Sequence, residues 1–139
     1  LVEYGQLAVA AQRGRRDPES LRIDTATDGV ITGTATINRD LIADGDSDVA
    51  VAIYDYSVLA GTQGFFHHQK LDRIFEVAER ECLPFVMYTE GGGGRPGDTD
   101  VKVNIAGLNS TSFSRWAGLT GKVPFKTPPA RAVNVIKPR

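Results

Sequence analysis

The sequence predicts an α/β fold in which a helix covers one small sheet. A β-branched run at 29–38 and an alternating apolar run at 48–56 flank a polar segment with an Asp-Gly pair, which is typical of a hairpin. An amphipathic helix and a short apolar strand that ends in four glycines follow. The order strand, helix, strand predicts a parallel βαβ unit with a ligand site at the carboxyl ends of its strands.

The elements are expected in the following order. Residues 1–16 carry apolar side chains at helical spacing and three arginines, and this spacing predicts a short amphipathic helix that stops at Asp17-Pro18. Residues 40–47 form the hairpin loop between the two strands. The clearest helical pattern places a set of apolar side chains on one face: Leu71, Ile74, Phe75, Ala78 and Cys82.

The single cysteine, Cys82, is expected to pack on this helix as a small apolar residue. Pro84 ends the helix and opens the last strand, PFVMYT. One cysteine excludes a disulfide framework and a zinc site built from Cys-x-x-Cys pairs.

Composition and net charge exclude several classes of protein and of binding partner. A chain of 139 residues that is 41% hydrophobic and 24% charged has the balance of one globular domain. A net charge of -1 offers no field for nucleic acid. Neither a membrane-spanning stretch nor a leader-like start is visible, so a cytoplasmic location is expected.

The loop EGGGGRPGDTD is the main candidate for chemistry. Gly92, Gly94 and Gly97 satisfy G-x-G-x-x-G, but Pro96 lies within the required helix start, and no acid stands at the ribose-binding distance. A P-loop would need Gly-Lys-Ser/Thr, which is absent. A backbone without Cβ atoms can press its N–H groups against a ligand oxygen, so one interpretation is an amide-lined pocket for a carbonyl or thioester oxygen. The alternative is a loose surface turn.

Three motifs occur in sequence: DGVITGTATIN at 28–38, YDYSVLAGTQG at 54–64 and EGGGGRPGDT at 90–99. Together with flanking segments from Tyr4 to Pro124, they resemble the amino-terminal half of the carboxyltransferase domain of biotin-dependent acyl-CoA carboxylases. That family includes the acetyl-, propionyl- and methylcrotonyl-CoA carboxylase types. The resemblance implies a crotonase-like fold of repeated β-β-α units.

The resemblance also implies transfer of a carboxyl group from carboxybiotin to the α-carbon of an acyl-CoA. Backbone amides of Gly92, Gly93 and Gly94 would stabilise the thioester enolate, with the departing biotin anion as base and no protein metal. No cofactor is expected to be covalently bound, because Tyr88 follows the only methionine, Met87, where a biotin attachment site has lysine. A biotinylated carrier protein or domain is therefore an expected partner, and a homo-oligomer is expected.

Further residues are candidates for contact with acyl-CoA. Gly61, Thr62, Gln63 and Gly64 with Lys70 could supply helix-terminal amides and a phosphate partner, the alternative being a helix cap and a solvated lysine. Arg95 could contact a phosphate or carboxylate, the alternative being a surface ion pair with Asp98 or Asp100.

Two other groups have weaker functional interpretations. His68, Asp72 and Glu76 lie along one helix side, where they could hold a metal, although an ordinary half-exposed helix is favoured. Four large aromatic side chains are expected to pack in the interior and not to stack on a ligand: Phe65, Phe66, Phe113 and Trp116.

After Pro124 the sequence departs from the family pattern, which has a second small-residue turn there. Residues 1–124 are thus expected to form a partial, apparently truncated carboxyltransferase domain, and residues 125–139 a basic, proline-containing tail with a short strand at 132–136. Two alternatives to the enzyme remain open: a non-catalytic acyl-CoA-binding module, and a structural module that assembles with itself through an exposed sheet edge.

Overall fold

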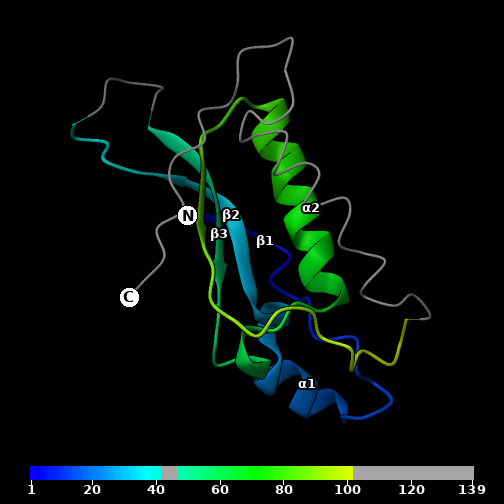
Figure 1. Cartoon of the computed structure of the whole chain (residues 1–139). Helices are drawn as coiled ribbons and strands as arrows, with labels where there is room; N and C mark the ends of the chain where they lie inside the picture. The colour runs from blue at the N-terminus through cyan, green and yellow to red at the C-terminus, as the bar shows by residue number, and fades with distance from the viewer. Residues whose placement is uncertain (42–46, 102–139) are drawn as a thin grey trace.

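A computed structural model describes residues 1–41 and 47–101. Four strands and two α-helices make up this part of the chain, with two short 3₁₀ turns (Figure 1). In chain order the elements are β1 (Val2–Tyr4), α1 (Pro18–Asp24), η1 (Ala26–Gly29), β2 (Val30–Thr36), β3 (Asp48–Tyr54), η2 (Leu59–Gly61), α2 (Phe65–Arg80) and β4 (Phe85–Tyr88).

The four strands form one sheet in the order β1-β2-β3-β4. β2 and β3 pair antiparallel from Val30 opposite Tyr54 to Thr36 opposite Asp48, which confirms the predicted hairpin. β3 and β4 pair in parallel, so the predicted βαβ crossover through α2 is also confirmed. The fold is mixed α/β as predicted, but the described residues contain one such unit and no repeat of it.

α2 lies across one face of the sheet (Figure 1). Its apolar side, including Leu71, Ile74 and Phe75, packs against alternate side chains of β2, β3 and β4. Ile74 is fully buried, and the Phe75 ring lies 4.7 Å from that of Phe85 in β4. Burial of this apolar face is what holds the helix on the sheet, because hydrophobic burial dominates folding.

Cys82 does not pack on that face, and the prediction for it is wrong. α2 ends at Arg80, and Cys82 is exposed in a left-handed conformation with φ of 53°. The Leu83 amide bonds the Ala78 carbonyl at 2.9 Å and the Cys82 amide bonds the Glu79 carbonyl at 3.3 Å, the pattern of a Schellman cap. Cys82 has the sequence spacing of the apolar helix face, but it lies two residues beyond the last residue of the helix.

Replacing Cys82 by glycine should stabilise the protein. Glycine adopts the left-handed cap conformation without the steric cost that a Cβ carries, and the gain should be about 1 kcal/mol. Urea unfolding of the wild type and the Cys82→Gly variant measures this difference. A variant that is no more stable than the wild type would contradict the assignment of Cys82 to the cap.

The predicted helix over residues 1–16 is also wrong. Val2–Tyr4 is a strand that pairs with β2, and Gly33 of β2 permits this approach because a Cβ there would overlap the Val2 carbonyl. Asp17-Pro18 starts a helix instead of ending one. The Asp17 carboxylate accepts from the Glu19 and Ser20 amides, 3.0 Å each, as a helix N-cap does.

Several sequence predictions concern residues that the structure does not describe. They are the tip of the hairpin loop at 42–46, the packing of Phe113 and Trp116, and the tail at 125–139 with its strand. Within residues 1–41 and 47–101, no helix has the length and apolar content needed to cross a membrane.

Candidate functional site

The glycine loop lies against the segment that leads into α2. The Gln63 amide donates to the Gly93 carbonyl and the Arg95 amide donates to the Gln63 carbonyl, both at 2.8 Å, so Gln63 and Gly94 form a parallel β-bridge. The Gly92 amide reaches the Ala60 carbonyl at 3.3 Å. The structure thus brings together two segments that the sequence analysis singled out separately.

Contact between the two segments requires glycine on both sides. Gly61 has φ of 63° and a Cβ there would overlap the Glu90 carbonyl oxygen, while a Cβ on Gly91 would overlap the Gly61 carbonyl oxygen. Their backbones therefore touch with no room for a side chain. Leu59 and Ala60 are also left-handed, with φ of 50° and 56°, so the whole turn before α2 has an uncommon conformation.

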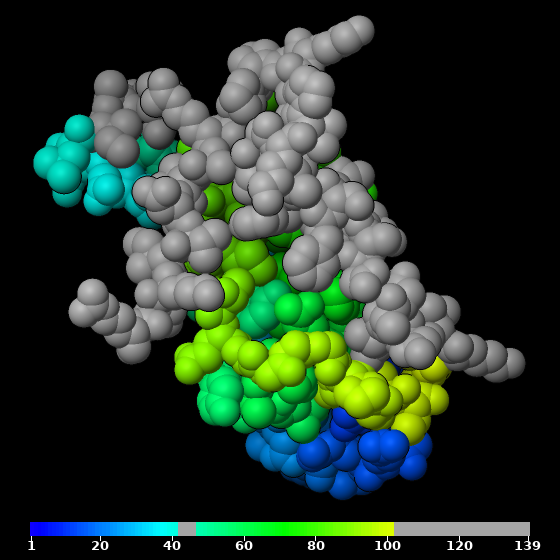
Figure 2. All heavy atoms as spheres, in the orientation of Figure 1, coloured from blue at the N-terminus to red at the C-terminus, as the bar shows by residue number. Residues whose placement is uncertain are grey.

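The other side of the loop is open. All four glycines from Gly91 to Gly94 are exposed, and the segment that contains them runs along the surface as a yellow-green band beside the green segment that precedes α2 (Figure 2). A Cβ on Gly93 would meet no atom of residues 1–41 or 47–101 within 4 Å. The Gly93 and Gly94 amides donate to no backbone or side-chain acceptor in the part of the chain that the structure describes.

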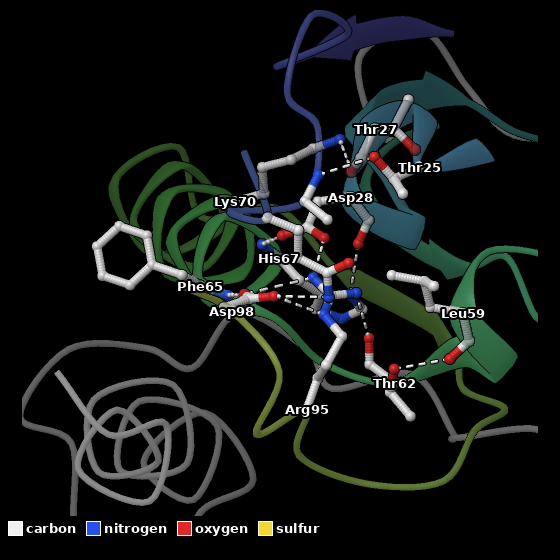
Figure 3. Close-up of polar contacts among 12 residues, drawn as sticks. Thr25, Thr27, Asp28, Leu59, Thr62, Phe65, His67, Lys70, Arg95 and Asp98 are labelled. Carbon is white, nitrogen blue, oxygen red and sulfur yellow. Dashed lines mark hydrogen bonds and ion pairs between the residues drawn. The ribbon is translucent and has the colours of Figure 1, made fainter. Parts of the chain in front are cut away.

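Arg95, next to the glycines, is buried, with 5% of its surface exposed. Its guanidinium pairs with Asp28 and with Asp98, the latter at 2.9 Å from Nε, and Nη1 donates to the Thr62 carbonyl at 3.3 Å (Figure 3). The expected ion pair with Asp98 is therefore present, but it is buried and not on the surface. Asp100 instead accepts from the Arg13 and Gly14 amides.

The first turn of α2 binds carboxylates of the protein itself. The Phe65 amide donates to Asp98 at 2.7 Å, and the His67 amide donates to Asp28 at 2.8 Å. Gly64, the N-cap residue, has no side chain to do this. These two helix-terminal amides therefore already bind buried anions, although helix-terminal amides in this region were predicted to bind a ligand anion.

Lys70 is buried, so its interpretation as a solvated lysine is wrong. Its ammonium donates to the Thr27 carbonyl at 3.1 Å and to the Val30 carbonyl (Figure 3). Burial lowers the pKa of Lys70 to about 8. Lys70 does not lie at the glycine loop. Its ammonium instead holds the turn at Thr27, Asp28 and Gly29, where all three residues have positive φ.

Asp28 is the centre of this buried polar cluster. Burial raises the pKa of its carboxyl, and attraction to Arg95 opposes that rise. Its carbonyl accepts from His67 Nδ1 at 3.1 Å, which fixes the proton of the neutral imidazole on Nδ1. His67 is fully buried against Tyr54, and its Nε2 has no hydrogen-bond partner among the described residues.

The buried position of His67 predicts that the protein loses stability in acid. Burial lowers the pKa of His67 to about 3 from an ordinary value of 6.5. Between these values the unfolded chain binds a proton that the folded chain excludes, so the free energy of unfolding falls as the pH falls below about 6.5. Asp28, whose pKa is raised, has the opposite effect.

The His67→Phe variant keeps an aromatic ring beside Tyr54 but removes this titration. Its melting temperature should fall less steeply than that of the wild type between about pH 6 and 4.5. Parallel melting profiles for the two proteins would show that His67 is not the group responsible.

Sequence reasoning missed Asp28 and His67 as site residues. Asp28 stands in the DGV motif, but nothing in that motif distinguishes a buried aspartate from the exposed aspartate that is common in turns.

No group of three or more His, Cys, Asp or Glu side chains in the described ranges is placed to hold a metal, and this includes the set His68, Asp72 and Glu76. Phe65 and Phe66 pack edge to face, 5.2 Å apart.

No protein-family model matches the sequence, but comparisons with individual known proteins find relatives. The chain is 32% identical over 87 residues to the chloroplastic acetyl-coenzyme A carboxylase carboxyl transferase subunit beta of Draba nemorosa, over 58% of this chain and 16% of that subunit. The subunit of the same name from Lactobacillus helveticus is 34% identical over 74 residues, which are 53% of this chain and 24% of that subunit.

A solved structure described as a single-chain, multi-domain long-chain acyl-CoA carboxylase is 51% identical, with a TM-score of 0.76, over 88% of this chain and 12% of that chain. The chain is thus homologous to part of the carboxyl transferase subunit beta of acetyl-CoA carboxylase and shares the fold of part of an acyl-CoA carboxylase. It spans no more than 24% of the length of these three proteins.

Proposed function

We propose that this chain is the acyl-CoA-binding part of a crotonase-like, biotin-dependent carboxyltransferase. The observation that carries the proposal is the exposed glycine loop, in which the Gly93 and Gly94 amides have no acceptor in the described part of the protein. The thioester oxygen of an acyl-CoA accepts from these two amides, whereas the Gly92 amide donates to the Ala60 carbonyl. The homology to carboxyl transferase subunits supports this assignment.

The chemistry suits backbone donors. Removal of a proton from the α-carbon places negative charge on the thioester oxygen, and fixed N–H groups stabilise that charge without titrating. Gly93 suits this role because the space beside its Cα is open, whereas Gly61 and Gly91 serve the contact between the two segments. Residues 61–64, which are Gly61, Thr62, Gln63 and Gly64, then support the glycine loop through the backbone contacts of Gly61 and Gln63. Lys70 and Arg95 do not contact the ligand in this proposal; they are buried and hold neighbouring backbone groups in place.

The remaining components come from outside this chain. The carboxyl group arrives as carboxybiotin on a biotinylated carrier protein or domain, and a second copy or a further domain completes the site. The solved relative is described as a long-chain acyl-CoA carboxylase, and this similarity favours a long-chain acyl group over a short one. A non-catalytic acyl-CoA-binding module is the alternative, and it uses the same loop.

Calorimetric titration tests the proposal directly. The purified chain is titrated with acetyl-CoA, propionyl-CoA and a long-chain acyl-CoA below its micelle concentration, and the same is done with Gly93→Val. Valine would place its side chain in the open space beside the loop and would also disfavour the φ of 91° at this position, so saturable binding should weaken about tenfold or more. Turnover with carboxybiotin then separates a transferase from a binding module.

The matched control for Gly93→Val is Gly97→Ala. Gly97 lies two residues after Arg95, and a Cβ there would meet Arg15 Nη1 at 3.2 Å, the end of an exposed side chain that can move, and Gln12 Nε2 at an ordinary contact distance of 3.5 Å. This variant should bind like the wild type. Absence of saturable binding by the wild type up to millimolar acyl-CoA, or equal binding by Gly93→Val, would contradict the proposed function.

A further inference from the structure

We infer that Arg95 is a positioning residue: its guanidinium, held between Asp28 and Asp98, sets the geometry of the neighbouring amides of Gly93 and Gly94. The inference deepens the proposed function and rests on it for its binding consequence. Its structural consequence, the conformation of the loop, is measurable without any ligand.

The guanidinium joins three separate parts of the chain. It is almost completely removed from solvent, pairs with Asp28 in η1, and donates through Nη1 to the Thr62 carbonyl just before α2, 3.3 Å away. Through Nε it pairs at 2.9 Å with Asp98, which lies three residues after Arg95 in the sequence. Arg95 therefore fixes the end of the loop relative to both α2 and the sheet (Figure 3).

The backbone of Arg95 transmits this constraint to the loop. Its amide donates to the Gln63 carbonyl at 2.8 Å, and the Gln63 amide donates to the Gly93 carbonyl at 2.8 Å. The Gly93 carbonyl and the Gly94 amide belong to the same peptide group, and they move together because that group is planar. A shift of Arg95 thus moves a candidate ligand donor through two hydrogen bonds, both made by Gln63.

The site is built for a planar guanidinium. Gly64 lies against it, so that a Cβ there would overlap Arg95 Nη2 and come within 2.7 Å of Asp98 Oδ2. Both partner carboxylates have side chains that are 0% exposed. Lysine would carry the same charge but could not bind two carboxylates and a carbonyl at once with its single nitrogen in this geometry.

Four glycines alone do not define a loop conformation, because glycine populates positive and negative φ with nearly equal ease. Gly91 and Gly93 have φ of 156° and 91°, values that few other residues adopt. Without a rigid anchor at each end, such a backbone would sample many orientations of its amides. Arg95 supplies that anchor at the carboxyl end, and the Gly61–Gly91 contact supplies it at the other.

The test compares two ways of displacing Arg95 with two controls. Arg95→Lys removes the planar group, and Gly64→Ala displaces it sterically while leaving Arg95 in the sequence. The control for Arg95→Lys is Arg73→Lys, since Arg73 is 62% exposed and pairs with Glu76 at the surface. The control for Gly64→Ala is Gly97→Ala. Asp98→Asn, which keeps an acceptor for the Phe65 amide, serves if Arg95→Lys does not fold.

The first readout is the amide resonances of Gly92, Gly93 and Gly94 in protein labelled with nitrogen-15 glycine, without ligand. Both displacing variants should shift or broaden these resonances while the two controls leave them unchanged. The second readout is acyl-CoA affinity, which should fall about tenfold or more in the displacing variants, the loss expected when hydrogen-bond donors are misplaced.

The two readouts separate the two ways of being wrong. Unchanged glycine resonances in folded Arg95→Lys or Asp98→Asn, and in Gly64→Ala, would overturn the positioning role, whatever the ligand does. Perturbed resonances in a protein whose wild type binds no acyl-CoA would support the positioning role and refute the proposed function. Perturbed resonances with unaltered acyl-CoA affinity would overturn the link between Arg95 and binding.

Discussion

Replacing Arg95 by methionine should destabilise the protein by about 3–5 kcal/mol, the usual cost of removing one partner from a buried ion pair. Methionine preserves much of the volume but leaves the Asp28 and Asp98 carboxylates, whose side chains are 0% exposed, without the guanidinium that pairs with them. Because whole domains are stable by only about 5–15 kcal/mol, this is a large fraction of the total. Urea unfolding measures the difference.

A compensating variant shows whether charge is the cause. Adding Asp28→Asn and Asp98→Asn to Arg95→Met removes both buried charges but keeps oxygen acceptors for the His67 and Phe65 amides. The triple variant should be more stable than Arg95→Met alone. A cost below about 1 kcal/mol for Arg95→Met, typical of an exposed ion pair, would contradict the structural account of the cluster.

Replacing Gly61 by alanine should separate the glycine loop from the segment before α2. The new Cβ would overlap the Glu90 carbonyl oxygen, a backbone atom that cannot rotate away, and φ of 63° disfavours alanine independently. We expect a loss of about 2–4 kcal/mol in the free energy of unfolding, from strain and lost contact together. The acyl-CoA affinity measured by calorimetry should fall with it.

Gly92→Ala is the matched stability control, because it alters the same loop. Among the residues that the structure describes, its Cβ would meet only Thr62 Cγ2, at an ordinary contact distance of 3.4 Å, and Gly92 has no positive φ. The cost should stay below about 1 kcal/mol. Equal costs for Gly61→Ala and Gly92→Ala would mean that the backbone contact between Gly61 and Gly91 does not hold the loop.

Strong periodic patterns allowed most of the fold to be predicted from sequence. The apolar face of α2 and the alternation in β3 are set by burial against each other, so these elements have local signatures. The segment at 1–16 had only a few apolar residues at helical spacing, and it folds as a strand and turns that leave Leu7 exposed. Gly5, with φ of 70°, and the cap at Asp17 were the signals that favoured the observed structure.

The site was only half predictable for a different reason. Runs of glycine are visible in a sequence, so the loop and the Gly61–Gly64 segment could be singled out, although not their contact. Whether Asp28 or Lys70 is buried depends on which distant residues surround it. The Asp28 pair with Arg95 spans 67 positions, and no local pattern records such a pairing.

If the glycine loop donates backbone hydrogen bonds to an acyl-CoA thioester, the carbonyl resonance of the bound thioester should report them. A long-chain acyl-CoA labelled with carbon-13 at the thioester carbonyl is added, below its micelle concentration, to the wild type and to Gly93→Val, and the carbonyl resonance is followed. The resonance of the wild-type complex should move downfield of that of the free acyl-CoA as the carbonyl is polarised, and Gly93→Val should abolish this shift. Saturable binding with an unshifted carbonyl, or the same shift in Gly93→Val, would contradict this role of the glycine loop.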